Sequence, residues 1–418
     1  MSDFKERLEQ ERRRFAMSGD SFRDLERRRD RKRRNRRLAS GLVALVIAAL
    51  GVGGGLYAFR PTRSALPVDS PTPSVEPTNP SPGPSPTTTP SPTLPVQELA
   101  GQVSGPIQFV DDQRGWMVDA DGQILATGDG GHTWNVQASG PSSIIAIQFL
   151  GDGLHGWGVG DGGLIRTTDG GAHWGTWSNE SLSSVQFVTP DIGWGVQGNP
   201  GPDAHGAIVK TTDGGATWEP QSVDGDSVCA LDESVVFTAG PTQGGVSLSR
   251  SGDGGASWVD SLISLPGEPW TATVRCGGID AWVLVQDGGA AGHLPYALFR
   301  TGEGGPDTLP VLQEAGTRPL GDVPGVLGAQ DPYPGPFVAF DGQEFRFVGW
   351  CPACGNSVAL YGGAGERTEV VQQGAMPLGI SFTDREHGWL LVQMDEPNGS
   401  QLRVLVTSDG GRTWTPLS

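Results

Sequence analysis

The amino-acid sequence predicts an all-β fold, a seven-bladed β-propeller of four-stranded antiparallel blades, preceded by one transmembrane helix and a disordered Pro/Ser/Thr-rich stalk. Three observations support this prediction. Sixty-five of the 418 residues are Gly and 33 are Pro, a composition typical of a chain with many tight turns. An eight-residue pattern, Ser/Thr-x-Asp-Gly-Gly-x-x-Trp, occurs five times after residue 100. A Gly-Trp marker recurs with it, and a repeat of about 45 residues has the length of one blade.

Charge is distributed unevenly along the chain. Residues 1–37 hold 15 Lys and Arg against 8 Asp and Glu, whereas the remainder has a net charge of −25. Residues 38–59 carry no charge, and 22 helical residues at about 1.5 Å each span a hydrocarbon core of roughly 30 Å. The positive-inside rule then predicts a basic cytoplasmic tail over 1–37, a transmembrane helix over 38–59 and an exported remainder. We therefore expect a single-pass protein of the cell membrane with a cytoplasmic N-terminus.

A cleavable signal peptide is the competing interpretation of residues 38–59. Its basic region would be unusually long, and the small-x-small cleavage site expected around residues 57–59 is weak. Residues 60–99 are mostly Pro, Ser and Thr and cannot bury a core, so we expect an extended stalk there. Residues 100–418 form the predicted propeller domain. Its acidity argues against nucleic acid as a partner.

Five copies of the Asp-Gly-Gly pattern, here named Asp boxes, mark one turn in each of five units. Their aspartates and tryptophans are Asp129 and Trp134, Asp169 and Trp174, Asp213 and Trp218, Asp253 and Trp258, and Asp409 and Trp414. The first four aspartates are 40, 44 and 40 residues apart. A degenerate copy at 301–305 has Glu303 in place of Asp, and the 106 residues from Glu303 to Asp409 leave room for an unmarked unit near 337–340. The total is seven units.

The Gly-Trp marker locates the first two strands of each unit. Apolar strands lead to Gly115-Trp116, Gly156-Trp157, Gly193-Trp194 and Gly388-Trp389, with Ala281-Trp282 as a variant and residues 235–237 in the corresponding place of the fourth unit. In the third unit the pattern predicts strands near 184–188, 193–196 and 207–210, with a short fourth strand from 217. Four short antiparallel strands make one blade.

Each residue type in the Asp box has a structural role that repeats once per blade. The aspartate accepts hydrogen bonds from backbone N–H groups of its own turn, and the glycines adopt positive φ without steric cost. The tryptophan folds back as a large apolar plug. Calcium ligation or acid catalysis is the alternative role for these aspartates, but a catalytic site needs one constellation rather than five identical turns. We expect the five Asp boxes to be structural, and no metal or cofactor is predicted.

These repeats resemble the bacterial neuraminidase repeat. The fuller unit, from Gly193-Trp194 through 208–215, is most similar to the photosystem II stability/assembly factor family of propellers, and the resemblance covers about 103–418. It implies the propeller fold. The assembly factors are not enzymes and hold protein partners during complex assembly, whereas related repeats also occur in sialidases, sortilin-type receptors and xyloglucan-degrading enzymes. The long stalk departs from the assembly-factor family.

The resemblance leaves two classes of function open. The first is a membrane-anchored scaffold that binds an extracytoplasmic protein or glycan without catalysis, and the second is an exported glycoside hydrolase of sialidase-like fold. A sialidase needs an arginine triad, a Tyr nucleophile with a Glu partner and an acid/base Asp, and the Arg-Ile-Pro marker of that family is absent. A pair of catalytic carboxylates would have to come from the 36 acidic residues after the stalk, and the sequence selects none of them.

Four basic residues stand directly before Asp boxes and are candidate binding residues: Arg166, Lys210, Arg250 and Arg300. The repeat places one of them on each of four blades. Two roles are consistent with this placement. They can support strand pairing and salt bridges between adjacent blades, or they can form a basic ring for an anionic partner.

The four cysteines divide into two pairs. Cys229 and Cys276 lie about one blade apart, each near the end of the first strand of its unit, so we expect a disulfide between successive blades. Cys351 and Cys354 invite comparison with a redox motif, but no strand–helix pattern surrounds them. We expect a local disulfide there, tightening the loop after the sixth blade, because export permits oxidation.

The predicted topology has a direct test. Protease added to intact cells should remove the propeller but spare residues 1–37, because only the exported part is accessible. The measurement is an immunoblot with one epitope tag at each end of the chain. Recovery of a soluble mature chain that has lost residues 1–59 would instead show that the apolar segment is a cleaved signal.

Overall fold

The computed structural model describes residues 107–417 and the backbone of 93–95. Short gaps in this range fall at 120–121, 140–143, 161, 199–204, 266–268, 289–292, 303–304, 308, 315–325, 341–343, 364 and 397–398. The predicted tail, the predicted transmembrane helix and most of the predicted stalk lie outside the described residues. Within the described residues, no helix has the length and apolar character needed to cross a membrane.

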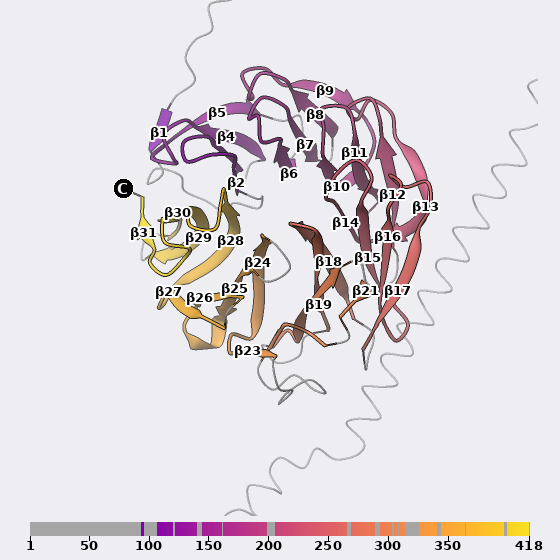
Figure 1. The fold of residues 1–418 in the computed structure, drawn as a ribbon. Helices are drawn as coiled ribbons and strands as arrows, with labels where there is room; N and C mark the ends of the chain where they lie inside the picture. The colour runs from indigo at the N-terminus through magenta and orange to yellow at the C-terminus, as the bar shows by residue number, and fades with distance from the viewer. Residues whose placement is uncertain are drawn as a thin grey trace, which may run out of the picture. The chain divides into compact units, whose positions relative to one another are not determined.

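Seven antiparallel blades surround a central axis, and each blade is built from consecutive strands (Figure 1). The strands of blades 1 to 3 are β2 (Ile107–Phe109), β3 (Gly115–Val118), β4 (Gln123–Thr127) and β5 (Thr133–Ser139); β6 (Ile144–Phe149), β7 (Gly156–Gly160), β8 (Gly163–Thr167) and β9 (Gly175–Ser178); and β10 (Leu182–Phe187), β11 (Gly193–Gln197), β12 (Gly206–Thr211) and β13 (Glu219–Gly225). The strands of blades 4 and 5 are β14 (Ser227–Ala230), β15 (Val236–Thr242), β16 (Gly245–Ser251) and β17 (Val259–Ser264); and β18 (Thr271–Gly277), β19 (Asp280–Gln286), β20 (Tyr296–Gly302) and β22 (Leu312–Glu314). The strands of blades 6 and 7 are β24 (Tyr333–Ala339), β25 (Phe345–Cys351), β26 (Ser357–Gly362) and β27 (Arg367–Val371); and β28 (Ala375–Phe382), β29 (Gly388–Glu396), β30 (Gly399–Thr407) and β31 (Thr415–Pro416). The predicted all-β, seven-bladed, four-stranded fold is confirmed, and the unmarked unit near 337–340 is blade 6.

Two blades carry additional strands. In blade 5, β21 (Gly305–Pro306) pairs with β20 where five of the other blades have an Asp box, and β23 (Leu327–Ala329) lies parallel to β22. This irregular edge follows the degenerate copy of the motif. In blade 1, the backbone of β1 (Thr93–Pro95) pairs with the outer strand β5. The propeller sheet therefore includes three residues of the segment predicted as stalk.

All five Asp boxes contain the same hydrogen bonds. In the third, Asp213 Oδ1 accepts from the Thr211 hydroxyl at 2.8 Å and from the Thr217 backbone N–H at 2.9 Å. Thr211 Oγ1 accepts from the Gly215 N–H at 2.8 Å, and the two glycines have φ of 74° and 96°. The same bonds to aspartate Oδ1 occur at Asp129, Asp169, Asp253 and Asp409. Each turn is thus closed by its own side chains.

Hydrogen bonds in these turns also shift the titration of the aspartates. Bonds led by the Ser257 hydroxyl lower the pKa of Asp253 to about 2, and bonds led by the Thr413 backbone N–H do the same for Asp409. A lowered pKa means that the carboxylate form is the one held in the folded turn. These aspartates therefore serve the turn as permanent acceptors at neutral pH.

One phenylalanine at the end of each regular inner strand joins neighbouring blades. The Phe187 ring stacks on Trp157 of the preceding blade, with centroids 3.7 Å apart and planes 4° apart, and meets Trp218 of its own blade edge-on. The Trp157 Nε1–H donates to the Gly214 carbonyl at 3.0 Å. A Cβ on Gly193 would lie 2.6 Å from the Phe187 ring. The glycine of the Gly-Trp marker is therefore required because the phenylalanine covers it.

The same contact closes the ring. Phe109 of blade 1 stacks on Trp389 of blade 7 at 3.9 Å, and the Trp389 Nε1–H donates to the Gly130 carbonyl at 2.9 Å. The Phe109 N–H also donates to Ser381 Oγ at 2.9 Å. Blades 1 and 7 share no strand, so side-chain contacts of this kind hold the first and last blades together.

A ring of side chains links the inner strands near the axis. The residue preceding each phenylalanine, or its counterpart, faces the inner strand of the next blade. Gln108 bonds to the backbone of Phe149 through both its amide atoms, at 2.9 and 2.8 Å. Equivalent glutamine bonds run from Gln148 to Phe187 and from Gln186 to Ala230. We call these seven equivalent positions the inner ring: Gln108, Gln148, Gln186, Cys229, Arg275, Val338 and Ser381.

Both cysteine pairs are joined in the structure. Cys229 of the inner ring bonds Cys276 of the next inner strand with a Cα–Cα distance of 5.6 Å, so a covalent link stands where other blades have a glutamine. Cys351 and Cys354, 5.2 Å apart at Cα, enclose the short 3-10 turn η2 (Pro352–Cys354). This turn joins β25 to β26, so the second bridge lies inside blade 6. The position predicted for it, a loop after the blade, is wrong because the hairpin between the second and third strands of blade 6 begins at Cys351.

Removal of one Asp-box carboxylate should destabilise the fold. Asp213→Ala removes the acceptor of the bonds above, and we expect a loss of roughly 1–3 kcal/mol in the free energy of unfolding. Denaturant titration followed by tryptophan fluorescence measures it. Asp191→Ala, at an exposed loop position, is the control and should change stability little. Loss of a binding activity with an unchanged unfolding midpoint would contradict the structural role.

The bridge between blades 4 and 5 should be detectable chemically. Denatured, unreduced protein should show no thiol that iodoacetamide alkylates. The double variant Cys229→Ser/Cys276→Ser should lose roughly 3–4 kcal/mol of unfolding free energy, because the bridge closes a loop of 47 residues. Two alkylatable thiols in the untreated protein would rule the bridge out.

Candidate functional site

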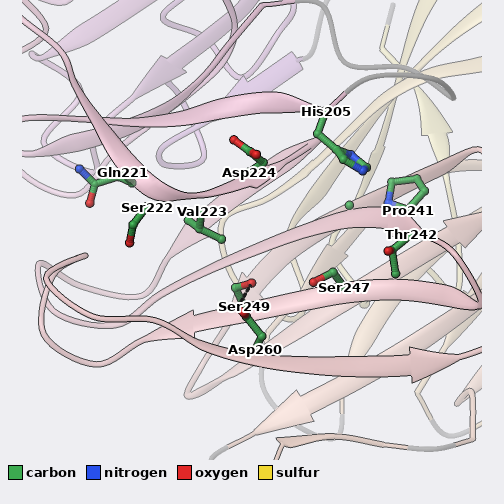
Figure 2. Close-up of a pocket in the computed structure, with 11 residues that line it drawn as sticks. His205, Gln221, Ser222, Val223, Asp224, Pro241, Thr242, Ser247, Ser249 and Asp260 are labelled. Carbon is green, nitrogen blue, oxygen red and sulfur yellow. Dashed lines mark hydrogen bonds between the residues drawn. The ribbon is translucent and has the colours of Figure 1, made fainter.

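A groove of about 480 Å³ lies between blades 3 and 4. Figure 2 shows side chains of the outer strand β13 on one side and those of β15, β16 and β17 on the other. Asp224 and Ser222 come from β13, whereas Ser249 and Asp260 come from blade 4. His205, directly before β12, stands at one end. The groove is therefore formed by one edge strand and the sheet of the next blade.

The regular contact between blades is interrupted at this interface. Blade 4 has Ala230 where the regular blades have phenylalanine. Among the described residues, Trp194 therefore has no aromatic ring to stack on, and its Nε1–H has no hydrogen-bond partner. Lys210 Nζ instead donates to the Gly254 carbonyl at 2.6 Å. Farther from the axis the facing side chains are mainly hydroxyls and small groups. Departure from the repeat thus coincides with the open groove.

The groove carries negative charge. Asp224 is exposed, and no cationic side chain pairs with it among the described residues. Asp260 is also exposed, and its Oδ1 accepts from the Ser249 hydroxyl at 2.6 Å. Both carboxylates are available to a ligand, and two like charges on one groove attract cationic groups to it.

A buried carboxyl lies behind one end of the groove. Asp226 has a side chain only 7% exposed, and its Oδ1 lies 3.0 Å from His205 Nδ1. Its Oδ2 has no hydrogen-bond partner within the part of the chain that the structure describes. Burial raises the pKa of Asp226 above its ordinary value, although the bond to His205 opposes the shift. The pair fixes the orientation of the imidazole that lines the groove.

Two of the candidate basic residues contact the next blade. Arg166 donates to the Pro190 carbonyl of blade 3 at 3.1 Å, and its guanidinium lies 4.8 Å from the centroid of the partly exposed Trp177. Lys210 contacts blade 4 as described above. Both side chains therefore contribute to packing between blades.

The other two candidates stay within their own blades. Arg250 places its guanidinium 5.8 Å from the centroid of Phe237, and Arg300 pairs with Asp307 at 3.1 Å. The four candidates do not converge, because the repeat sends each to a different blade. None of them lines the groove.

One cluster contains residue types that a sialidase would use. The Tyr361 hydroxyl donates to Asp331, and Arg367 lies 3.5 Å from the same carboxylate. Burial and the Asp331 hydrogen bond raise the pKa of Tyr361, which disfavours the phenolate. Tyr361 and Asp331 are 4% and 2% exposed. Because substrate has no access to these two side chains, the cluster is an internal network between blades 5 and 6.

The sequence patterns did not select the groove residues. His205, Asp224, Asp226 and Asp260 belong to no motif. The fourth unit lacks the Gly-Trp marker and has Ala230 in place of the phenylalanine that ends the first strand of the regular blades. The fifth and sixth units also depart from the repeat at this position, so the departure alone did not select the groove. In the described part of the chain, no three His, Cys, Asp or Glu side chains are grouped so that they could hold a metal ion.

Comparison with known proteins gives likenesses of fold. No protein-family model matches the chain, and no curated protein matches it. Among solved structures, YCF48 bound to a D1 peptide is 18% identical with a TM-score of 0.48, and the match covers 76% of this chain and 98% of that chain. YCF48 from Cyanidioschyzon merolae is 18% identical with a TM-score of 0.39, over 78% and 87% of the two chains. The GH74 xyloglucanase from Xanthomonas campestris is 14% identical with a TM-score of 0.35, over 72% and 62%.

These structures include both classes of protein that the repeats resemble. YCF48 is a photosystem II assembly factor, as the sequence resemblance predicts, and the GH74 protein is a glycoside hydrolase. At such identities the likeness does not extend to function. The chain is a seven-bladed β-propeller with an acidic groove between two of its blades.

Proposed function

We propose that this protein is a membrane-anchored scaffold that binds a protein partner outside the cytoplasm without catalysis. The observation that carries the proposal is the groove between blades 3 and 4, with its two exposed carboxylates and, among the described residues, no Lys or Arg in its lining. A site of this shape and charge binds an extended polypeptide segment that is rich in Lys or Arg. The N-terminal basic tail and charge-free segment support anchoring through residues 38–59.

The chemistry of the groove favours a polypeptide over a glycan. Hydroxyls and carboxylates dominate the lining, and no Trp, Tyr or Phe is among its residues. A sugar ring therefore finds no flat apolar surface to lie on. An extended basic chain can place ammonium or guanidinium groups on Asp224 and Asp260 and donate backbone N–H groups to the serine hydroxyls.

The arrangement of the acids also bears on the rival function. A glycoside hydrolase needs one carboxylic acid to donate a proton and a second carboxylate on the opposite side of the scissile bond. Asp226 has a raised pKa, but His205 covers it and it does not line the groove. The structure thus supports a binding role for this groove more directly than a catalytic one.

Neutralising the groove should weaken binding of a basic peptide. We expect Asp224→Asn/Asp260→Asn to lower the affinity of the full chain for a (Lys-Ser)4 peptide about tenfold, because two charge-assisted contacts are lost. Fluorescence anisotropy with labelled peptide measures it, and the affinity of the unaltered protein should fall as salt is raised. A (Glu-Ser)4 peptide should not bind.

A matched control removes two exposed acids elsewhere. Asp191→Asn/Glu366→Gln changes the net charge equally and should leave the peptide affinity unchanged. Equal weakening by both double variants would show general charge attraction and contradict a site in the groove. Hydrolysis of fluorogenic glycosides that the groove variant abolishes would replace the scaffold with the glycoside hydrolase.

A further inference from the structure

Arg275 is the charged member of the inner ring. It pairs in register with Trp282, as Gln108 pairs with Trp116 in blade 1. On the same strand, Cys276 bonds blade 4, so the alternation of a β-strand turns Arg275 toward blade 6. Figure 1 shows that β18, which carries Arg275, is one of the strands nearest the axis. Arg275 is therefore carried by a strand that lies close to the axis (Figure 1).

The Arg275 side chain is solvent-exposed and yet enclosed by protein. It falls among the exposed residues, but the surrounding atoms desolvate the guanidinium and lower its pKa. A side chain that extends into a water-filled space between the inner strands can be exposed to solvent and still be surrounded by protein atoms. Its hydrogen bond is to the Val274 carbonyl, at 3.2 Å, within its own strand.

In the described part of the chain, no carboxylate lies within ion-pairing distance of the Arg275 guanidinium, although the chain after residue 37 is strongly acidic. A guanidinium that is surrounded by protein atoms and has no ion-pair partner is held less favourably than one in bulk water. Glutamine occupies the equivalent position in three blades and links it to the next inner strand. An arginine here therefore contributes less to the fold than the residue the repeat already uses.

We propose that Arg275 binds a carboxylate at the axis of the propeller. The guanidinium presents parallel N–H donors that match the two oxygens of a carboxylate. The other inner-ring residues are uncharged, so one monoanion balances the site, whereas a dianionic phosphate would leave a negative charge uncompensated. The site is separate from the groove between blades 3 and 4, which attracts the opposite charge.

Acetate is the probe for this site. Thermal unfolding of the full chain in detergent should shift upward by roughly 2–4 °C in sodium acetate at ten times its Kd, relative to sodium chloride of equal ionic strength. Arg275→Gln should abolish the acetate shift while its own Tm is equal to or above that of the unaltered protein, because the glutamine removes an unpaired charge and is the residue that three other blades use at this position. Arg403→Gln, at an exposed position on β30, should retain the acetate shift.

Further ligands identify the source of the carboxylate. One further ligand is a short Gly-Ser peptide with a free C-terminus. If this peptide raises the Tm more than acetate does, and more than its own amidated form does, the site binds a polypeptide carboxylate. If acetate raises the Tm as much as the peptide does, the site binds a small carboxylic acid. Three results would overturn the proposal: an acetate shift retained in Arg275→Gln, a lower Tm for that variant without ligand, or a larger Arg275-dependent shift with phosphate than with acetate.

Discussion

The fold depends on a phenylalanine held between two tryptophans, one from its own blade and one from the blade before. In the regular blades this ring stacks flat on one indole and meets the other edge-on, as Phe109, Phe149 and Phe187 do. The stacked indole donates to a carbonyl in the next Asp box, so packing and hydrogen bonding join the same two blades. Apolar area and ring geometry both favour this contact.

Several features of the sequence follow from that contact. The Gly of the Gly-Trp marker is small because the phenylalanine ring covers it, and the Asp box must be rigid because its carbonyl receives the neighbouring indole. Since no strand is exchanged between the first and last blades, the same contact between Trp389 and Phe109 also closes the ring. Because the same residues recur in each regular blade, the contact that joins one pair of regular blades also joins the next pair.

Both proposed sites lie where the repeat fails. Between blades 3 and 4 the phenylalanine is replaced by Ala230, and an acidic groove opens at the same interface. In blade 5 the inner-ring glutamine is replaced by Arg275, which leaves a cation near the axis. A residue that departs from the repeat and adds no stability is a candidate for a role in binding.

The sequence by itself determined the number of blades, their strand order and the structural role of the Asp boxes. Those features rest on local chemistry that repeats at a fixed spacing, so Asp213 and Trp218 can be interpreted without knowledge of any distant residue. The cysteine pairing also followed, because Cys229 and Cys276 hold nearly equivalent places in successive units. The arrangement of Asp224, Asp260 and Arg275 did not follow from the sequence. Their positions depend on how an outer strand faces the next sheet and how seven inner strands meet around one axis, and these are contacts between residues that no motif relates. Tertiary structure alone decided them, because charge and exposure at a site are set by all the chain segments that surround it.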